Sequence, residues 1–157
     1  ITPVFNEQTG LLLTSTSWPK KELQAIKPDG QGNVTQTHIV WRNLPGAPYV
    51  PSPIAVGSYF LTISEIRNEI HCFDAATGKD LWHMPLGHSH ASPVAVGDLV
   101  YFLNDSGVMN VIRAGEKYEL VATNELGEEC YASPAISGGQ IFLRSFKNLF
   151  CIGQSGK

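Results

Sequence analysis

The segment GHSH, which begins at residue 87, contains the side chains of this chain that are best suited to chemistry. On a strand, alternation would point His88 and His90 to the same side, where both imidazoles could bind a divalent metal together with His83. A closed zinc site needs four ligands, and Glu128 or Glu129 would have to complete it. A metal-dependent activity at His88 and His90 is therefore one alternative, and a polar loop is the other.

Two further motifs suggest chemistry but lack the surroundings that it needs. The letters around Ser89 are similar to a Gly-x-Ser-x-Gly nucleophile elbow, yet that motif requires a strand-to-helix turn and this segment leads into a strand. The stretch PDGQGN at 28–33 contains Gly-x-Gly without a strand–turn–helix unit, so a hairpin turn is favoured over a phosphate-binding loop. The sequence predicts no catalytic residue.

The composition excludes several classes of protein. The chain has 157 residues, of which 43% are hydrophobic and 16% charged, as expected for one folded domain. Its 11 Lys and Arg against 14 Asp and Glu argue against a nucleic-acid surface. No apolar run approaches the ~18 residues of a membrane-spanning helix. Cys72, Cys130 and Cys151 have no CxxC spacing, and we expect three half-buried thiols.

Three similar phrases, SPIAVG, SPVAVG and SPAISGG, divide the chain into repeats. Their prolines are 40 and 41 residues apart, and a glycine follows each proline by four residues. These residues are Pro53, Pro93 and Pro134 with Gly57, Gly97 and Gly138. Such a period indicates stacked supersecondary units. We place the repeats at about 1–44, 45–87, 88–127 and 128–157, the last one incomplete.

Each repeat divides into short runs that are typical of strands. The runs are rich in Val, Ile, Phe and Tyr and are separated by Gly, Asn, Asp and Ser. KKELQAIK is the nearest candidate for a helix, but the repeat register aligns its residues 23–26 with 70–73 and 109–112, which favours a strand. Four antiparallel strands in about 40 residues predict a propeller blade. The expected fold is an all-β propeller of about four repeats, roughly half of a seven- or eight-bladed ring.

The segment CFDAATGKDLW at 72–82 contains the most specific motif. It resembles the blade signature of propellers related to pyrroloquinoline-quinone (PQQ) dehydrogenases, in which an Asp-x-x-Thr-Gly turn leads to a Trp. The matching residues are Asp74, Thr77, Gly78 and Trp82. The same residues suit a tight hairpin, because glycine adopts a positive φ and aspartate caps backbone N–H groups. The tryptophan can bury a large area against the neighbouring blade.

The resemblance also implies a bacterial, periplasmic or cell-envelope location. Family members that bind PQQ hold it between a Trp and a vicinal disulfide, with a Ca²⁺ ion nearby. This chain has no adjacent cysteines, so we expect neither PQQ nor another cofactor. We favour a non-catalytic PQQ-like propeller segment that acts as a binding or scaffolding module in a larger exported protein. The alternative is a fragment of a quinoprotein dehydrogenase.

The loops that enter each first strand, and those between the second and third strands, should meet on one face around the channel mouth. Function on rigid β scaffolds concentrates on such loops. The candidate residues of this face are Tyr49, Arg67, His88, His90, Glu129, Tyr131 and Arg144. We expect a protein or small-molecule ligand there. Because the ring is incomplete, the remaining blades of a parent protein or a second copy of the chain should cover its open edges.

Overall fold

The computed structural model describes residues 1–16 and 20–153, and every helix or strand assigned in these residues is a β-strand. The strands form four antiparallel sheets, blades 1 to 4. Blade 1 contains β1 (Val4–Asn6), β2 (Leu11–Thr16), β3 (Glu22–Ile26) and β4 (Ile39–Asn43). Blade 2 contains β5 (Ile54–Val56), β6 (Tyr59–Ser64), β7 (Glu69–Asp74) and β8 (Asp80–Pro85). Blades 3 and 4 contain β9 (Val94–Val96), β10 (Leu99–Leu103), β11 (Val108–Arg113), β12 (Glu119–Glu125), β13 (Ala135–Ser137), β14 (Gln140–Arg144) and β15 (Leu149–Gly153).

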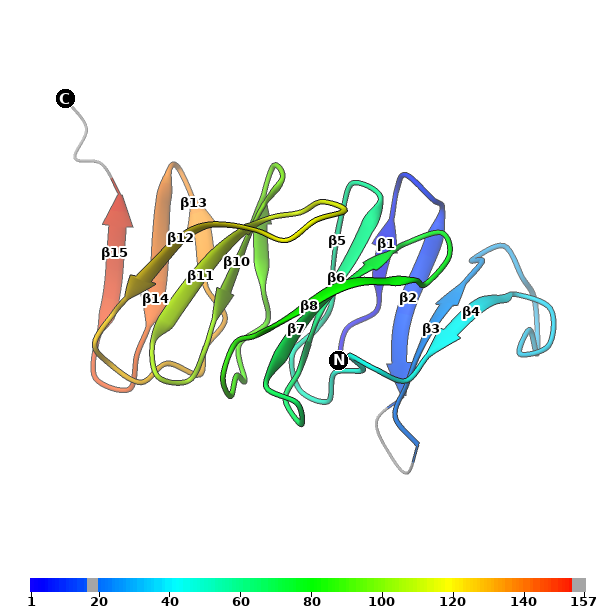
Figure 1. Cartoon of the computed structure of the whole chain (residues 1–157), viewed down its shortest axis with the longest axis horizontal. Helices are drawn as coiled ribbons and strands as arrows, with labels where there is room; N and C mark the ends of the chain where they lie inside the picture. Colours follow the sequence, from blue (N-terminus) through cyan, green and yellow to red (C-terminus); the bar gives the residue numbers. More distant parts are fainter. Residues whose placement is uncertain (17–19, 154–157) are drawn as a thin grey trace.

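The four blades stand in one row, each with its strands in chain order (Figure 1). The first strands β1, β5 and β9 lie next to one another, while the fourth strands lie at the opposite edge of each sheet. This arrangement confirms the prediction of an all-β propeller of about four blades. The strand expected at residues 23–26 is confirmed as part of β3. The described residues contain no helix long and apolar enough to cross a membrane.

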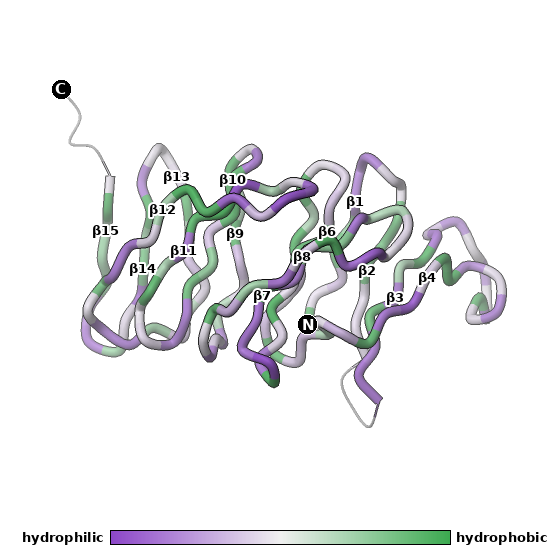
Figure 2. The backbone as a smooth tube through the Cα atoms, viewed as in Figure 1, coloured by the Kyte–Doolittle hydropathy of each residue, from purple (hydrophilic) through white to green (hydrophobic). Residues whose placement is uncertain are grey.

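The hydrophobic core lies between the blades. Successive residues of a strand point to opposite faces of its sheet. On β6, Phe60 therefore packs toward blade 1 with Leu13, whereas Leu61 packs toward blade 3 with Phe102. A third cluster, which includes Leu143, joins blades 3 and 4. Because both faces of the inner sheets are buried, apolar residues dominate the central strands (Figure 2).

The repeated glycines close the hairpins between the first and second strands. Gly57, Gly97 and Gly138 have φ angles of 55°, 61° and 57°, a region that other residues avoid. Each glycine directly follows a first strand and lies in the turn that leads into the second. The positive φ explains why a glycine recurs four residues after each proline.

The repeated Ser-Pro pairs join neighbouring blades. The Ser52 Oγ accepts the backbone N–H of Thr2 at 3.0 Å, and the Ser92 Oγ accepts that of Ser52 at 2.9 Å. The Ser133 Oγ accepts the N–H of Ser92 at 2.9 Å. The prolines that follow these three serines are buried and have no N–H that would need a partner. We call this row of hydrogen bonds, accepted by Ser52, Ser92 and Ser133, the serine ladder. It gives a physical reason for the repeated phrase.

The tryptophans of the fourth strands dock onto the next blade. The Trp41 indole Nε1–H donates to the Ala75 carbonyl at 3.0 Å, and the Trp82 Nε1–H donates to the Gly115 carbonyl at 2.9 Å. Both carbonyls belong to the turn between the third and fourth strands of the following blade. Trp82 is half-buried, so it covers less area than the sequence motif suggests. The Asp-x-x-Thr-Gly turn of blade 2 is thus the docking surface for blade 1.

The cysteines differ from the expectation of three half-buried thiols. Cys72 and Cys130 are fully buried, and Cys151 on β15 is exposed. Burial, together with the nearby charge of Asp80, raises the pKa of the Cys72 thiol to about 12. Burial also raises the pKa of Cys130. Of the three thiols, only the Cys151 side chain is accessible to reagents in solution.

Candidate functional site

The loop face, at the lower edge of Figure 1, is held together by carboxylates that bind backbone N–H groups. Glu65, in the β6–β7 loop, accepts the N–H of Tyr49 at 2.9 Å. Asp105, in the β10–β11 loop, accepts the N–H of His90 at 2.9 Å. Tyr49 and His90 both lie in loops that enter a first strand. In blades 2 and 3 the two kinds of loop therefore lie side by side and are fixed to each other.

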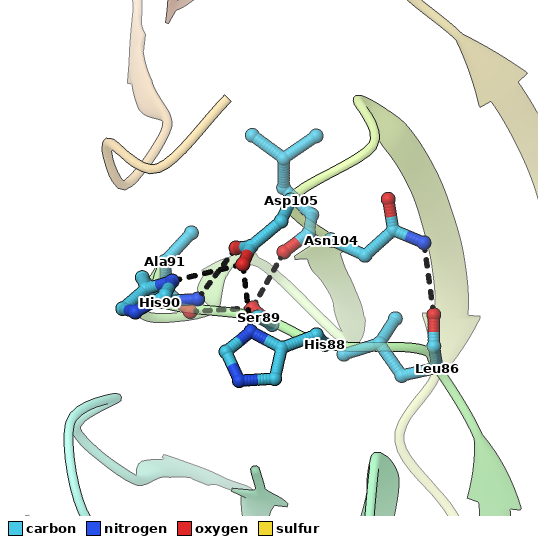
Figure 3. Close-up of polar contacts among 8 residues, drawn as sticks. Leu86, His88, Ser89, His90, Ala91, Asn104 and Asp105 are labelled. Carbon is cyan, nitrogen blue, oxygen red and sulfur yellow. Dashed lines mark hydrogen bonds and ion pairs between the residues drawn. The ribbon is translucent and has the colours of Figure 1, made fainter. Parts of the chain in front are cut away.

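Asp105 is the centre of the polar cluster in blade 3 (Figure 3). Its Oδ2 atom lies 2.7 Å from the Nδ1 of His88 and 2.9 Å from the Nδ1 of His90. The side chain of Ser89 points the other way, is fully buried, and donates its hydroxyl proton to the Leu103 carbonyl at 2.7 Å. Ser89 thus anchors the loop and is not placed as a nucleophile.

The Asp105 carboxyl is held in its ionised form. Burial raises its pKa, but hydrogen bonds from the ring of His88 and from the backbone and ring of His90 outweigh that effect. The net result is a pKa below the ordinary value for aspartate. One donor atom from each of the three side chains lies within 4.8 Å of the others, so the cluster offers a cation three ligands. A metal-dependent activity at this cluster remains a prediction.

The surroundings of His88 and His90 differ from the sequence-based expectation. Both residues lie in a loop, not on a strand, and they converge because each faces Asp105. His83 lies on β8 in a separate group of side chains. Glu128 accepts hydrogen bonds from the side chains of Ser145 and Asn148, at 2.5 and 2.8 Å. Neither His83 nor Glu128 joins the two histidines.

Asp105 is the functional candidate that sequence reasoning missed. It follows Pro93 by twelve residues, as Glu65 follows Pro53, so both repeats carry an acidic residue at the same position. Both carboxylates accept backbone N–H groups of the preceding loop. An alignment of the repeats at this position could have identified Asp105 from the sequence.

Four rings form a continuous row across the loops of blades 3 and 4. This aromatic row consists of His88, His90, Tyr131 and Phe146. The His90 and Tyr131 rings stack with centroids 4.7 Å apart, and Phe146 meets Tyr131 edge-on at 4.9 Å. Tyr131 is 46% exposed and Phe146 59% exposed. A shallow pocket of about 220 Å³ lies beside the row, with Arg144 in its lining.

The remaining predicted face residues occupy different surroundings. Tyr49 is exposed and lies under the ammonium of Lys21, which is 4.8 Å from the centre of its ring. Arg67 is exposed in the β6–β7 turn, and Glu129 is exposed in the loop before β13. The Arg144 guanidinium donates to the carbonyls of the β14–β15 turn and so holds that turn in place. Only His88, His90 and Tyr131 of the predicted set form one contiguous group.

A comparison with known protein families identifies the family to which this propeller belongs. A family model described as "Outer membrane protein assembly factor BamB" matches residues 5–116 and 66–152 of the chain. The chain belongs to this family. The two overlapping matches cover most of the sequence, as expected when repeats of one kind follow one another. This match confirms that the repeats of the BamB-family chain are PQQ-like propeller repeats. No curated protein sequence matches it.

Solved structures similar to the BamB-family chain share its fold. BamB from Moraxella catarrhalis has a TM-score of 0.77 and 15% identity, over 96% of this chain and 45% of that one. The computationally designed Ika8 protein has a TM-score of 0.69 and 10% identity, over the same two shares. A europium-containing methanol dehydrogenase has a TM-score of 0.56 and 16% identity, over 77% and 23%. The chain thus spans less than half the length of each structure.

The described residues of the BamB-family chain do not fit a PQQ site of the kind that the resemblance implies. Trp41 and Trp82 both use their indole N–H groups between blades, on the outer strands. Trp18 lies outside the described residues. A vicinal disulfide joins adjacent cysteines, and Cys72, Cys130 and Cys151 are all far apart in the sequence. The tryptophan–disulfide pair that would hold the quinone is therefore missing from the described part of the chain.

Proposed function

We propose that the chain is a non-catalytic propeller segment that binds other proteins through its aromatic row and works without PQQ. The exposed side chains of Tyr131 and Phe146 carry this proposal. Tyrosine and phenylalanine are enriched in protein interfaces, where they bury a large area at a small cost in side-chain entropy. The loops under the row are already fixed by Asp105 and Glu128, so binding need not order them.

The family supports a scaffolding role in the bacterial envelope. The matching family is described as an outer membrane protein assembly factor. The chain spans 45% of the similar BamB structure. We propose that it forms part of a larger exported protein whose propeller presents the aromatic row to a partner in the periplasm or at the cell envelope.

A photocrosslinking amino acid at position 131 tests the protein-binding face. We expect Tyr131→benzoylphenylalanine to crosslink the parent protein to one discrete envelope protein in living cells. Adding Phe146→Ala should reduce that crosslink several-fold, because the edge-on contact between the two rings positions Tyr131. The measurement is the yield of the crosslinked band, with its partner identified by mass spectrometry.

The matched control places the same photocrosslinker at Lys79. Lys79 is exposed in the β7–β8 turn, next to the β5–β6 hairpin and at the opposite edge of the blades from the loop face. We expect no discrete crosslink there. Equal crosslinking from positions 79 and 131, or none from 131, would contradict binding through the aromatic row.

The open edge of blade 4 suggests a second kind of partner, one that would cover an exposed sheet. Within residues 1–16 and 20–153, β15 is hydrogen-bonded only to β14, and its Leu149 is 69% exposed. A cavity of about 410 Å³, with Leu143 and Ile152 in its lining, lies between blades 3 and 4. Open strand edges and apolar patches favour association. We propose that further blades of the parent protein, or a second copy of the chain, cover this surface.

Light scattering on a sizing column tests the proposed association. We expect the isolated chain to have a mass at high concentration that is at least twice the 17.1 kDa of one chain. Leu149→Lys should shift the chain toward monomer, since it places a charge on the exposed face of the open sheet. Val121→Lys, on the exposed outer strand of blade 3, is the control and should leave the mass unchanged. A mass of one chain at every concentration would contradict the association.

A further inference from the structure

A second group of polar side chains lies on blade 2, between β7 and β8. His71 and His83 are directly paired across the antiparallel ladder, so both side chains lie on the same face of the sheet. A β-bulge at Leu81 shifts the register and brings Asp80 to that face as well. Without the bulge, two residues three positions apart on one strand would point to opposite faces.

His71 is held rigidly in this group. Its side chain is only 2% exposed, and its ring stacks on Phe73 with centroids 5.8 Å apart. The backbone of Gly46 packs against the same ring so closely that a Cβ there would lie 2.7 Å from it. The imidazole of His71 therefore has one fixed orientation, with a carboxylate near each of its two nitrogens.

The distances between the polar atoms suit a bound cation. The His71 Nδ1 lies 3.0 Å from the Asp80 Oδ2, and the His83 Nδ1 lies 3.7 Å from the same oxygen. Tetrahedral zinc with bonds of about 2.0–2.1 Å places its ligand atoms about 3.3 Å apart. The two distances to the Asp80 oxygen are thus within a few tenths of an ångström of that value, and all three ligand atoms lie within 4.8 Å of one another.

The group also leaves hydrogen-bonding capacity unused. Among the described residues, the buried side-chain atoms without a hydrogen-bond partner are the Glu69 Oε2, the His71 Nε2 and the Asp80 Oδ1. All three belong to this one group. The Glu69 Oε2 lies 3.4 Å from the His71 Nε2 without forming a hydrogen bond. Buried polar groups are almost always paired, and an absent ion is one of the recognised explanations when they are not.

A divalent cation accounts for all three atoms together. Within the described residues, no lysine or arginine forms a salt bridge with Glu69 or Asp80. A cation on the two Nδ1 atoms and on both oxygens of the Asp80 carboxylate would neutralise that charge and use the idle Oδ1. It would also keep the His71 proton on Nε2, where it can be donated to Glu69. A carboxylate behind a metal-binding histidine is a common arrangement in metal sites.

We propose that His71, Asp80 and His83 bind a divalent transition metal of the zinc class, and that Glu69 orients His71 by a hydrogen bond. Two imidazoles and one carboxylate favour zinc, cobalt, nickel or copper over calcium and magnesium, which prefer oxygen ligands. His83 is 59% exposed, so a fourth position is open to water on that side. The cluster around Asp105 differs, because both of its carboxylate oxygens already accept hydrogen bonds.

Zinc titration of the tag-free chain tests the site. We expect stoichiometric Zn²⁺ binding by calorimetry, a rise in the melting temperature with Zn²⁺, and visible absorption bands when Co²⁺ replaces it. The key variant is His83→Ala combined with Asp80→Asn, since His83 is exposed and its loss leaves the core intact. This variant should lose the temperature rise and bind at least about tenfold more weakly, as expected on removal of metal ligands. Circular dichroism without metal checks that it is folded.

The double variant His88→Ala with His90→Ala is the matched control, because it removes the other histidine pair. It should keep the zinc-dependent rise in melting temperature and the Co²⁺ bands. Glu69→Gln should weaken zinc binding by about 10–100-fold, the usual effect of losing a group that hydrogen-bonds a ligand. No Zn²⁺ binding by the native chain, or binding that survives in the His83 and Asp80 variant, overturns the proposal. Unchanged affinity in Glu69→Gln overturns the role of Glu69.

Discussion

Replacement of Gly78 by alanine is expected to lower the free energy of unfolding by about 2–5 kcal/mol, the sum of a backbone effect and an overpacking effect. Gly78 has a φ of 73°, which costs any other residue conformational energy. A Cβ at this position would also lie 2.4 Å from the Trp41 ring. Trp41 cannot easily move away, because its indole N–H is bound to Ala75 and its ring packs against Phe60.

Gly97→Ala is the control that separates the two effects. Gly97 has a similar φ of 61°, but no atom lies within 4 Å of a Cβ added to it. We expect a loss of about 1–2 kcal/mol, the cost of the left-handed backbone alone. Urea unfolding followed by circular dichroism gives both values. Equal losses of unfolding free energy at positions 78 and 97 would show that the Trp41 ring moves aside for the new Cβ. The packing between blades 1 and 2 would then be easily deformed.

The fold could be predicted from the sequence because its signals are local and repeated. The glycine of each hairpin turn stands a fixed four residues after the proline, and the strand length follows from the spacing between such signals. The strand at 23–26 followed from alignment with 70–73 and 109–112, although its composition alone resembles a helix. Repetition thus supplied the information that a single short segment lacks.

The candidate sites could not be predicted in the same way, because they depend on contacts between loops and on one irregularity. Asp105 meets His88 across 17 residues, at a distance set by how two loops fold over the blade. The sequence suggests His83 as a third ligand beside His88 and His90. The ladder register instead pairs His83 with His71, and the bulge at Leu81 brings Asp80 to the same face. The same bulge recurs at Val40 in blade 1 and at Val121 in blade 3, so it belongs to the repeat, whereas the histidines and carboxylates beside it belong to blade 2 alone.

The serine ladder shows where sequence reasoning found a pattern without its cause. In the sequence, the Ser-Pro pairs mark the repeats, but nothing local assigns a partner to the serine hydroxyls. The structure shows that each serine hydroxyl accepts an N–H from the preceding blade. The donor and acceptor stand about forty residues apart, so only the stacking of one repeat on the next reveals the bond. The ladder joins all three pairs of neighbouring blades, and the tryptophan contacts add a second edge between blades 1 and 2 and between blades 2 and 3.

Truncation of Trp82 is the second large effect that we expect. Trp82→Ala should lower the free energy of unfolding by about 3 kcal/mol, at the lower end of the range for a packed tryptophan. The value lies there because the indole is half-buried, between blade 2 and Tyr118 of blade 3. The loss includes its packing against Tyr118, at 5.4 Å between ring centres, and its hydrogen bond to the Gly115 carbonyl. Urea unfolding again gives the measurement.

One further variant separates packing from hydrogen bonding at this contact, and two histidine variants serve as controls. Trp82→Phe keeps a ring but removes the Nε1–H, so it should cost about 1–2 kcal/mol, mostly from the unpaired Gly115 carbonyl. His88→Ala and His90→Ala, in the loop around Asp105 at the opposite edge of the blades, should each cost less than about 1 kcal/mol. If either histidine variant costs as much as Trp82→Ala, the loop around Asp105 is part of the stabilising core. The aromatic row would then be a structural feature of blades 3 and 4, and its exposure would not indicate a binding surface.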